Sequence, residues 1–332
     1  MVFIKSNRIF YAILILLFFS DFLQALQSTT HYAHEIVQAK QDKYNHIMCI
    51  TIPKCGTHLF VKCLALFNLK NVDIFFEYNQ KPKDKEAWLN KRMKEAIKTN
   101  KKLAPDYDRG NLHIPSVGVL PPQYIINSMQ KSQGKLVLEH WPYTKQSEQF
   151  FNRHTIANFF IIRDPRDMLV SMAFFLHKGP DNLVMKVDDL IFDFIDGRKK
   201  HFVPWGVGTN SAYPLLYEHG ITEFYKLYLP WMQARKFCTV KFENLVGSKG
   251  GGSDAAQLLE IKKIADYLGV KLTGKQVKNI IDNLYGQTST FREGQIGSWK
   301  KHFTPEMKAV YKKVPGACEL LVALGYEKDK NW

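Results

Sequence analysis

Residues 46–68 read HIMCITIPKCGTHLFVKCLALFN, with a polar turn between two apolar runs. The apolar run Ile47–Ile52 predicts a buried strand, and the apolar run Leu59–Phe67 predicts a helix. Between them lies a polar turn, residues 53–58, with the sequence PKCGTH. A strand, a glycine turn and a helix together direct backbone N–H groups and a helix N-terminus at an anion. The stretch therefore predicts a phosphate-binding loop.

Two side chains of this turn suit the same task. Lys54 contributes a mobile positive charge, and Thr57 contributes a hydroxyl group. The common nucleotide-binding loop, G-x-x-x-x-G-K-[ST], does not occur in the chain. Taken alone, the turn also fits an ordinary connection between a strand and a helix, since such connections often contain Gly and Thr.

The composition of the chain points to an anionic partner. Its 332 residues suit one large α/β domain, and its formal net charge is +15. Such a balance is typical of proteins that bind nucleic acid, acidic membranes, phosphorylated cofactors or acidic polysaccharides, although a solvated basic surface gives the same balance. No basic stripe interleaved with aromatic residues occurs, so we expect no nucleic-acid partner. The five cysteines include no C-x-x-C pair, so we expect neither a metal site nor a disulfide framework.

The N-terminus differs from the rest of the chain. Residues 1–27 contain two early basic residues followed by the apolar run Ile9–Phe19, which has the length of a signal-peptide core and is short for a spanning helix. A cleaved signal peptide and an uncleaved membrane anchor both fit. We therefore expect a secreted or membrane-anchored protein, with residues 28–45 as a linker and residues 46–328 as the functional domain.

Three more apolar runs predict buried strands, at Lys135–Glu139, Ala157–Ile162 and Phe237–Phe242. A strong helix start, Asp164-Pro165, follows the third strand of the chain. Further helices are predicted at residues 81–102, 123–129, 222–236, 254–268 and 274–284, and after Thr304. Capping boxes are predicted at Asp254 and Thr273. Residues 104–122 and 177–220 are predicted to be loops, and the second is long enough to act as a lid.

Strands that alternate with helices predict a mostly parallel central sheet with helices on both faces, in a three-layer α/β fold that is P-loop-like. Ligands of such sheets bind at the carboxyl ends of the strands. Polar residues follow three of the predicted strands: the PKCGTH turn, His140 and Arg163. We therefore expect these three to meet at one edge of the sheet.

Two other stretches are candidate anion sites. Arg163 leaves its strand, and Ser171 lies two turns into the following helix. Residues 291–300, FREGQIGSWK, place Arg292 in a glycine-containing loop that can fold over a ligand. Each has a plain alternative, because Arg163 can pair with Asp167 and the loop can be a basic surface segment.

The three sites in this order resemble the sulfotransferase superfamily, whose members use 3'-phosphoadenosine-5'-phosphosulfate (PAPS). Residues 53–58 look like the family's P-K-[ST]-G-T-T loop, and residues 163–171 look like its R-(D/N)-P-x-D-x-x-x-S segment. Residues 292–300 look like R-K-G-x-x-G-x-W-K, and residues 241–244 look like F-Y-E-(D/N). The resemblance covers residues 46–303.

The resemblance implies a role for each matching residue. Lys54 would contact the 5'-phosphate and offset the charge of the leaving group, as a catalytic residue. The remaining turn residues would hold the 5'-phosphate, chiefly through backbone N–H groups: Cys55, Gly56, Thr57 and His58. The 3'-phosphate would be held by Arg163, Ser171, Arg292, Glu293 and Gly294.

Two further roles come from the same resemblance. The adenine would lie near Phe242 and Phe291. His140, which ends its strand as in the family's K-x-H-x-P segment, would be the general base that takes the proton of the acceptor hydroxyl. A strand-end histidine that only caps its neighbours is the plain alternative.

Four residues depart from the family pattern. Cys55 replaces Ser or Thr, His58 replaces a second Thr, and Phe242 replaces Tyr. Glu293 replaces Lys and so removes a positive charge beside the 3'-phosphate, which weakens the expected affinity for PAPS.

Rival functions fit the sequence less well. A cysteine phosphatase would need an arginine six residues after Cys55, where the chain has Val61. An inactive sulfotransferase-like protein that binds a nucleotide or a sulfated glycan remains as the alternative. The acceptor is a hydroxyl-bearing molecule, with a phenol, a lipid alcohol, a glycan and a peptide tyrosine all open. Segments 73–130 and 177–215 are expected to line its site.

Overall fold

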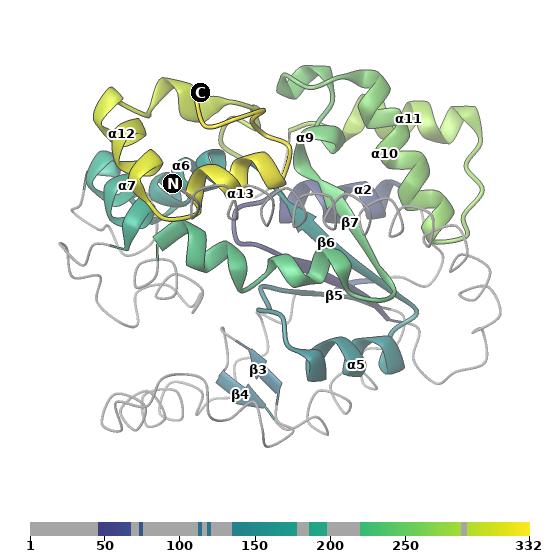
Figure 1. Ribbon diagram of the computed structural model, residues 1–332. Helices are drawn as coiled ribbons and strands as arrows, with labels where there is room; N and C mark the ends of the chain where they lie inside the picture. Colours follow the sequence, from purple (N-terminus) through teal and green to yellow (C-terminus); the bar gives the residue numbers. More distant parts are fainter. Residues whose placement is uncertain are drawn as a thin grey trace, which may run out of the picture.

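A sheet of five parallel strands forms the centre of the protein, in the order β2-β5-β1-β6-β7 (Figure 1). The computed structural model describes residues 46–67, 73–75, 112–114, 118–120, 135–177, 186–197, 220–286 and 291–332. The strands of the sheet are β1 (Ile47–Thr51), β2 (Asp73–Phe75), β5 (Lys135–Glu139), β6 (Ala157–Ile162) and β7 (Phe237–Lys241). Every residue of β1 and β6 is buried, because helices cover both faces of the sheet.

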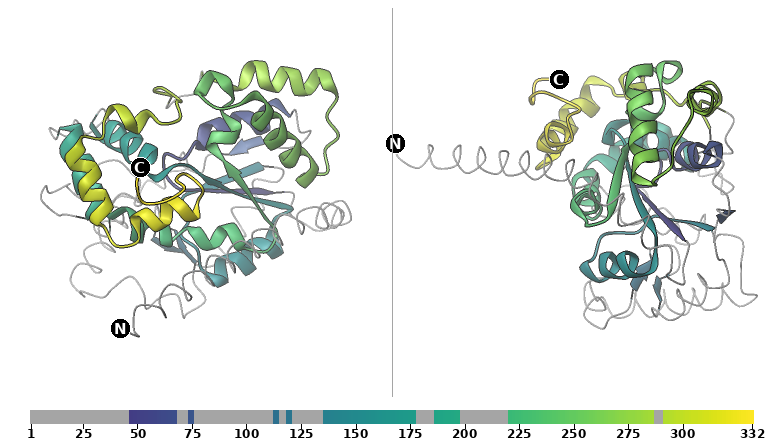
Figure 2. Two further views of the ribbon diagram at one scale, coloured as in Figure 1. Left: turned by 45° about the horizontal axis from the view of Figure 1, so that its top comes forward. Right: turned by 90° about the vertical axis from the view of Figure 1, so that its right-hand side faces the viewer.

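The helices form two outer layers (Figures 1 and 2). Helices α2, α10 and α11 cover one face of the sheet, while α5 covers the other together with residues 220–233. Helices α6, α7, α12 and α13 gather beyond the carboxyl ends of the strands. The bounds are α2 (Thr57–Leu66), α5 (Lys145–His154), α6 (Pro165–His177), α7 (Val187–Asp196), α9 (Phe242–Leu245), α10 (Asp254–Tyr267), α11 (Gly274–Leu284), α12 (Pro305–Lys313) and α13 (Ala317–Ala323).

The predicted three-layer fold is confirmed, and most predicted element positions agree with it. The strands predicted at residues 135–139 and 157–162 have the observed bounds. Helix α6 begins at Pro165, and the Asp164 carboxylate accepts the N–H of Arg166 at 2.9 Å, which satisfies a free donor of the first turn. Thr273 and Gln276 form the predicted capping box of α11.

Other predictions of local structure are wrong. The helix predicted over residues 222–236 stops at residue 226, and a 3₁₀ segment at Leu229–Gln233 follows, because Pro230 cannot donate the next helical hydrogen bond. The cap of α10 is Ser253 and not Asp254. The two predicted loops contain an antiparallel pair, β3 (Leu112–Ile114) and β4 (Gly118–Leu120), and helix α7. Helices α5 and α13 were not predicted.

Several predictions fall on residues outside the described ranges. These are the helices at 81–102 and 123–129, the linker at 28–45 and the signal or anchor segment at 1–27. Over the ranges that are described, none of the helices combines the length and the apolar character that crossing a membrane requires. Among the described residues this finding contradicts the expected membrane anchoring, and we do not carry the expectation of a secreted or membrane-anchored protein further.

Candidate active site

The carboxyl ends of four neighbouring strands bring the predicted polar residues to one edge of the sheet. The turn at residues 52–56 follows β1, His140 follows β5, and Arg163 follows β6. Strand β7 lies beside β6 and ends at Lys241, and Phe242 follows it as the first residue of α9. Since β5, β1, β6 and β7 are adjacent and parallel, their following residues converge as the sequence predicts.

The turn after β1 holds two residues in the left-handed backbone region. Gly56 has a φ of 102°, and a Cβ atom at this position would lie 2.6 Å from the Phe242 ring. Only glycine satisfies both constraints. Lys54 has a φ of 65°, a left-handed conformation that residues other than glycine seldom adopt. This strain marks the turn as a functional candidate.

Helix α2 begins directly after this turn. Its N-cap is Gly56, which offers no side chain to cap the free N–H groups, and its first turn contains no acidic residue. The first N–H groups of a helix have no intrahelical acceptor, so they are available to an anion. The N-terminus of α2 therefore has donors available at the place where the sequence predicts an anion-binding element.

Arg163 is buried with its guanidinium at the same edge. One Nη2–H bond goes to the Gln295 carbonyl at 2.9 Å, and the guanidinium carbon lies 4.2 Å from the centre of the Phe242 ring. The predicted alternative, a pair with Asp167, is present only at 3.9 Å. In the part of the chain that the structure describes, the buried Nε–H of Arg163 has no acceptor. The residue can therefore still donate to a ligand oxygen.

Helix α6 provides aromatic supports for two more cations. The Lys54 ammonium lies 4.0 Å from the centre of the Phe175 ring, and the Arg292 guanidinium lies 4.2 Å from the centre of the Phe174 ring. Ser171 lies one turn earlier on the same helix, so it shares the face that carries these two rings. Arg292 is far from Lys54 in the sequence, and its contact with Phe174 of α6 places it near Lys54.

Three cations consequently crowd together. Burial, together with repulsion from the nearby guanidinium groups of Arg163 and Arg292, lowers the pKa of Lys54 to about 8. Burial and the same kind of repulsion also lower the pKa of Arg292. A bound anion would relieve this repulsion, so the electrostatics of the edge favour an anionic ligand.

His140 is oriented by the end of β1. Its Nδ1 atom lies 2.8 Å from the Thr51 carbonyl oxygen and 2.8 Å from the Thr51 hydroxyl, which in turn lies 2.8 Å from the Thr57 hydroxyl. A carbonyl only accepts, so Nδ1 carries the proton and Nε2 keeps its lone pair. Burial lowers the pKa of His140 to about 4, and repulsion from Lys54 and His58 acts in the same direction. The imidazole is therefore a neutral base near pH 7.

The loop at residues 291–300 carries the remaining predicted residues. Glu293 pairs with Arg292, with 2.8 Å between Oε1 and Nη1, so it partly neutralises the guanidinium beside it. Gly294 has a φ of 63°, and a Cβ atom there would lie 2.5 Å from the Phe291 ring. Phe291 is 41% exposed and meets the Tyr285 ring edge-on at 5.4 Å between centres. It is therefore accessible to a flat ligand.

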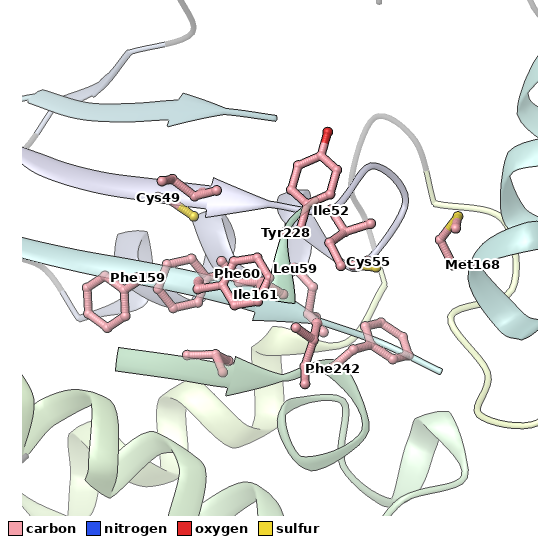
Figure 3. Close-up of a cluster of buried hydrophobic side chains, with 14 of the residues drawn as sticks. Cys49, Ile52, Cys55, Leu59, Phe60, Phe159, Ile161, Met168, Tyr228 and Phe242 are labelled. Carbon is pink, nitrogen blue, oxygen red and sulfur yellow. The ribbon is translucent and has the colours of Figure 1, made fainter. Parts of the chain in front are cut away.

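Two predicted residues do not face this edge. Phe242 is buried beneath Gly56 and Arg163, where it supports the turn. Cys55 is fully buried among apolar side chains, and its N–H donates to the Ile52 carbonyl at 3.1 Å (Figure 3). Its Sγ lies 3.6 Å from the Tyr225 hydroxyl, and burial raises the pKa of the thiol to about 12. Cys55 is thus a packing residue and not a nucleophile.

We expect Cys55 in the folded protein to resist alkylation by iodoacetamide at pH 8, because the thiolate is the reactive form and its population is very small there. Peptide mass spectrometry after a short labelling pulse measures this, with urea-unfolded protein as the positive control. Cys55→Ala is expected to keep its catalytic turnover. A rapid modification of Cys55 that stops turnover would instead support a covalent role.

Sequence comparison identifies the family. The family model described as the sulfotransferase domain matches residues 44–289, which is well over half of the chain. The chain belongs to the sulfotransferase domain family. The matched residues include the turn after β1, His140, Arg163 and Ser171, and the match ends before the loop that carries Arg292.

Individual sulfotransferases align along most of the chain. Sulfotransferase 2A1 of Mus musculus is 22% identical over 311 residues, which cover 85% of this chain and 88% of that protein. Sulfotransferase 2A2 of Rattus norvegicus is 23% identical over 302 residues, which cover 82% and 83%. Among solved structures, mouse sulfotransferase SULT7A1 complexed with PAP shares 14% identity and a TM-score of 0.51, over 81% of this chain and 82% of that chain. At this identity the likeness shows the fold.

The structure of this sulfotransferase adds residues that the sequence reasoning missed. Thr51 orients His140, and Phe174 and Phe175 support the two mobile cations. Thr51 could have been predicted, because it lies at the end of a predicted strand next to the turn. The two phenylalanines had no signal beyond their helical spacing from Ser171.

Proposed function

We propose that this sulfotransferase moves the sulfuryl group of PAPS to a hydroxyl-bearing acceptor in one in-line step. The acceptor oxygen bonds to sulfur as the bond from sulfur to the 5'-phosphate oxygen breaks, and the hydroxyl proton goes to His140 Nε2. The observation that carries the proposal is the convergence of Lys54, Arg163 and Arg292 beside the N-terminus of α2 and a neutral His140.

In this proposal the chain has two separate binding sites, one for each phosphate of PAPS. Lys54 and the first N–H groups of α2, at Thr57 and His58, are placed for the 5'-phosphate, with Gly56 allowing close approach. Arg163, with its Nε–H free to donate, fits the 3'-phosphate, and so do the neighbouring groups of the α6 face and the last loop: Ser171, Arg292 and Gly294. The structural neighbour from mouse was solved with PAP, which carries the same two phosphates.

His140 acts as the base in this proposal. The Thr51 carbonyl holds the proton on Nδ1, so Nε2 is the atom that receives the proton of the acceptor. Lys54 remains near the leaving oxygen and offsets the negative charge that develops there. We propose that Phe291 contacts the adenine. Phe242 contributes to nucleotide binding only indirectly, because it supports the turn that contains Gly56.

The acceptor is proposed at the level of a class. It bears a hydroxyl group, and it is a phenol, a lipid alcohol, a glycan or a peptide tyrosine. Most of residues 73–130 and 177–215, which we expect to line its site, lie outside the described ranges. We propose that the sulfotransferase domain spans residues 46–328, since helices α12 and α13 continue the fold past the family match.

The dependence of kcat/KM on pH should be bell-shaped. His140 must be neutral to act as a base, so the rate is expected to fall as the pH drops through about 4. Lys54 must be charged, so the rate is expected to fall as the pH rises through about 8. Initial rates at limiting PAPS measure both limbs, and Lys54→Met should lose the alkaline limb. An acid limb near 6.5, the ordinary value for histidine, would contradict the buried-base assignment.

Radiolabelled sulfate transfer tests the proposed function. Purified protein is incubated with labelled PAPS and one acceptor of each class: a phenol, a sterol, a glycan and a tyrosine peptide. Binding of adenosine 3',5'-bisphosphate is measured in parallel by calorimetry, with Arg163→Ala as the control that should weaken it. Transfer to any acceptor supports the proposal. Nucleotide binding without transfer to any of the four would favour the inactive, nucleotide-binding alternative.

A further inference from the structure

Asp167 joins two parts of the candidate site that are far apart in the chain. It lies in the first turn of α6 and is 1% exposed. Its Oδ2 accepts the N–H of Gly297 at 2.8 Å, and its Oδ1 accepts the N–H of Trp299 at 2.8 Å. Both donors belong to the loop that carries Arg292. One carboxylate therefore fixes this loop to the helix that carries Ser171.

The loop needs such an anchor on the side of α6. Its other side is held by the glycine turn before α10, where Ile296 N–H donates to the Gly250 carbonyl at 2.8 Å and Gln295 Nε2 donates to the Lys249 carbonyl at 2.9 Å. Tyr285 adds a hydrogen bond to the Glu293 carbonyl at 2.7 Å. Toward α6, the described contacts of the loop backbone are its two hydrogen bonds to the Asp167 carboxylate and the one that the Gln295 carbonyl accepts from Arg163.

The carboxylate acts on the loop more than on Arg163. Its closest approach to the Arg163 guanidinium is 3.9 Å, while both loop N–H groups lie at hydrogen-bonding distance. Arg163 instead donates to the Gln295 carbonyl of the same loop at 2.9 Å. Arg163 thus binds the loop at Gln295, and Asp167 binds it at Gly297 and Trp299. Arg163 keeps its Nε–H for a ligand.

We propose that Asp167 is a positioning residue that holds the Arg292 loop over the 3'-phosphate and so sets the preference for nucleotides that carry it. This inference rests on the proposed function, in which Arg163, Ser171 and Arg292 bind that phosphate. Asp167 touches no reacting atom. Its effect passes through the backbone of Gly297 and Trp299 to the guanidinium of Arg292.

The direction in which replacing Asp167 changes the affinity for the 3'-phosphate separates a positioning role from a purely electrostatic one. Asp167 is a negative group beside an anion site, so its loss should strengthen phosphate binding if only charge mattered. In Asp167→Asn the amide keeps one acceptor and turns a donor toward the second loop N–H, which loosens the loop. Positioning therefore predicts weaker binding of the 3'-phosphate, opposite to the charge effect.

Calorimetric titration of two nucleotides tests the inference. For Asp167→Asn we expect the Kd of adenosine 3',5'-bisphosphate to rise about tenfold or more, and the Kd of adenosine 5'-monophosphate to stay within about twofold. Glu148→Gln is the matched control. Glu148 is also a buried carboxylate that accepts a loop N–H, from Arg235 at 2.9 Å, but it belongs to α5 and not to α6 or the Arg292 loop. We expect it to change neither Kd.

The outcomes separate this inference from the proposed function. If wild-type protein binds neither nucleotide, the proposed function fails. If wild type prefers the bisphosphate and Asp167→Asn keeps or increases that preference, the positioning role fails. Should Asp167→Asn not fold, Tyr285→Phe loosens the opposite side of the loop by removing its bonds to Glu293 and Gln295. Loss of preference in that variant supports positioning by the loop, and an unchanged preference overturns it.

Discussion

Replacing His140 by alanine is expected to lower the turnover number for sulfuryl transfer by about 10²–10⁴-fold while nucleotide affinity stays within about twofold. The imidazole is neutral, its Nδ1 proton is committed to the Thr51 carbonyl, and its Nε2 is the only base the proposal uses. Its described hydrogen bonds go to Thr51 at the end of β1, and the Thr51 hydroxyl in turn lies beside the Thr57 hydroxyl. Steady-state kinetics and calorimetry on the same preparation measure both quantities.

The matched control is His154→Ala. His154 ends α5 and packs on the Phe150 ring, with 4.6 Å between ring centres. It comes just before β6, at the amino ends of the parallel strands, whereas the site lies at their carboxyl ends. We expect it to leave turnover and affinity unchanged. If His140→Ala retained wild-type turnover, His140 would be removed from the mechanism. If it lost nucleotide binding as well, its role would be structural.

Replacing Lys54 by methionine is expected to lower kcat by about 10²–10³-fold, with a smaller rise in the KM for PAPS. Methionine keeps the length and apolar stem that pack on Phe175 and removes the charge. The proposal assigns that charge to the leaving oxygen, where it matters more in the transition state than in the bound donor. Arg163 and Arg292 continue to bind the donor, so affinity should suffer less than turnover.

Separate measurement of kcat and KM decides this prediction. Lys278→Met is the control, because Lys278 is exposed on α11 and pairs only with Asp282 at 2.7 Å among the contacts described. We expect it to behave as wild type. If Lys54→Met raised KM and left kcat unchanged, Lys54 would be a binding residue with no part in stabilising the leaving group.

Local apolar patterning predicted most of the sheet. The runs KLVLE and ANFFII coincide with β5 and β6. Continuous apolar residues mark strands that are covered on both faces, and every residue of β6 is buried. The pattern failed where the signal was weak or interrupted. Helix α5, KQSEQFFNRH, is polar apart from two phenylalanines, and it is held by its Thr144 cap and by packing against residues 220–233. Pro230 divided a segment whose apolar spacing predicted one helix.

The candidate site divides in the same way. Lys54, Arg163 and Arg292 were found from the chemistry of short motifs, and the parallel order of the strands was enough to place the first two together. The last loop could not be placed from its sequence, since its position depends on the Asp167 carboxylate of α6. Cys55 and Phe242 looked like site residues in sequence, but packing turned both toward the core.

The sequence by itself determined the strand, turn and helix at residues 46–68, the residues that can carry charge or a proton, and the alternation that makes the sheet parallel. These depend on interactions between near neighbours in the chain, which short patterns encode. The tertiary structure decided which groups act together. The pKa values of Lys54 and His140 are shifted mainly because folding buries them and places other cations beside them. The tautomer of His140 depends on a contact between residues that are 89 positions apart in the chain, and the position of Arg292 depends on one between residues 130 positions apart. No short pattern encodes such contacts.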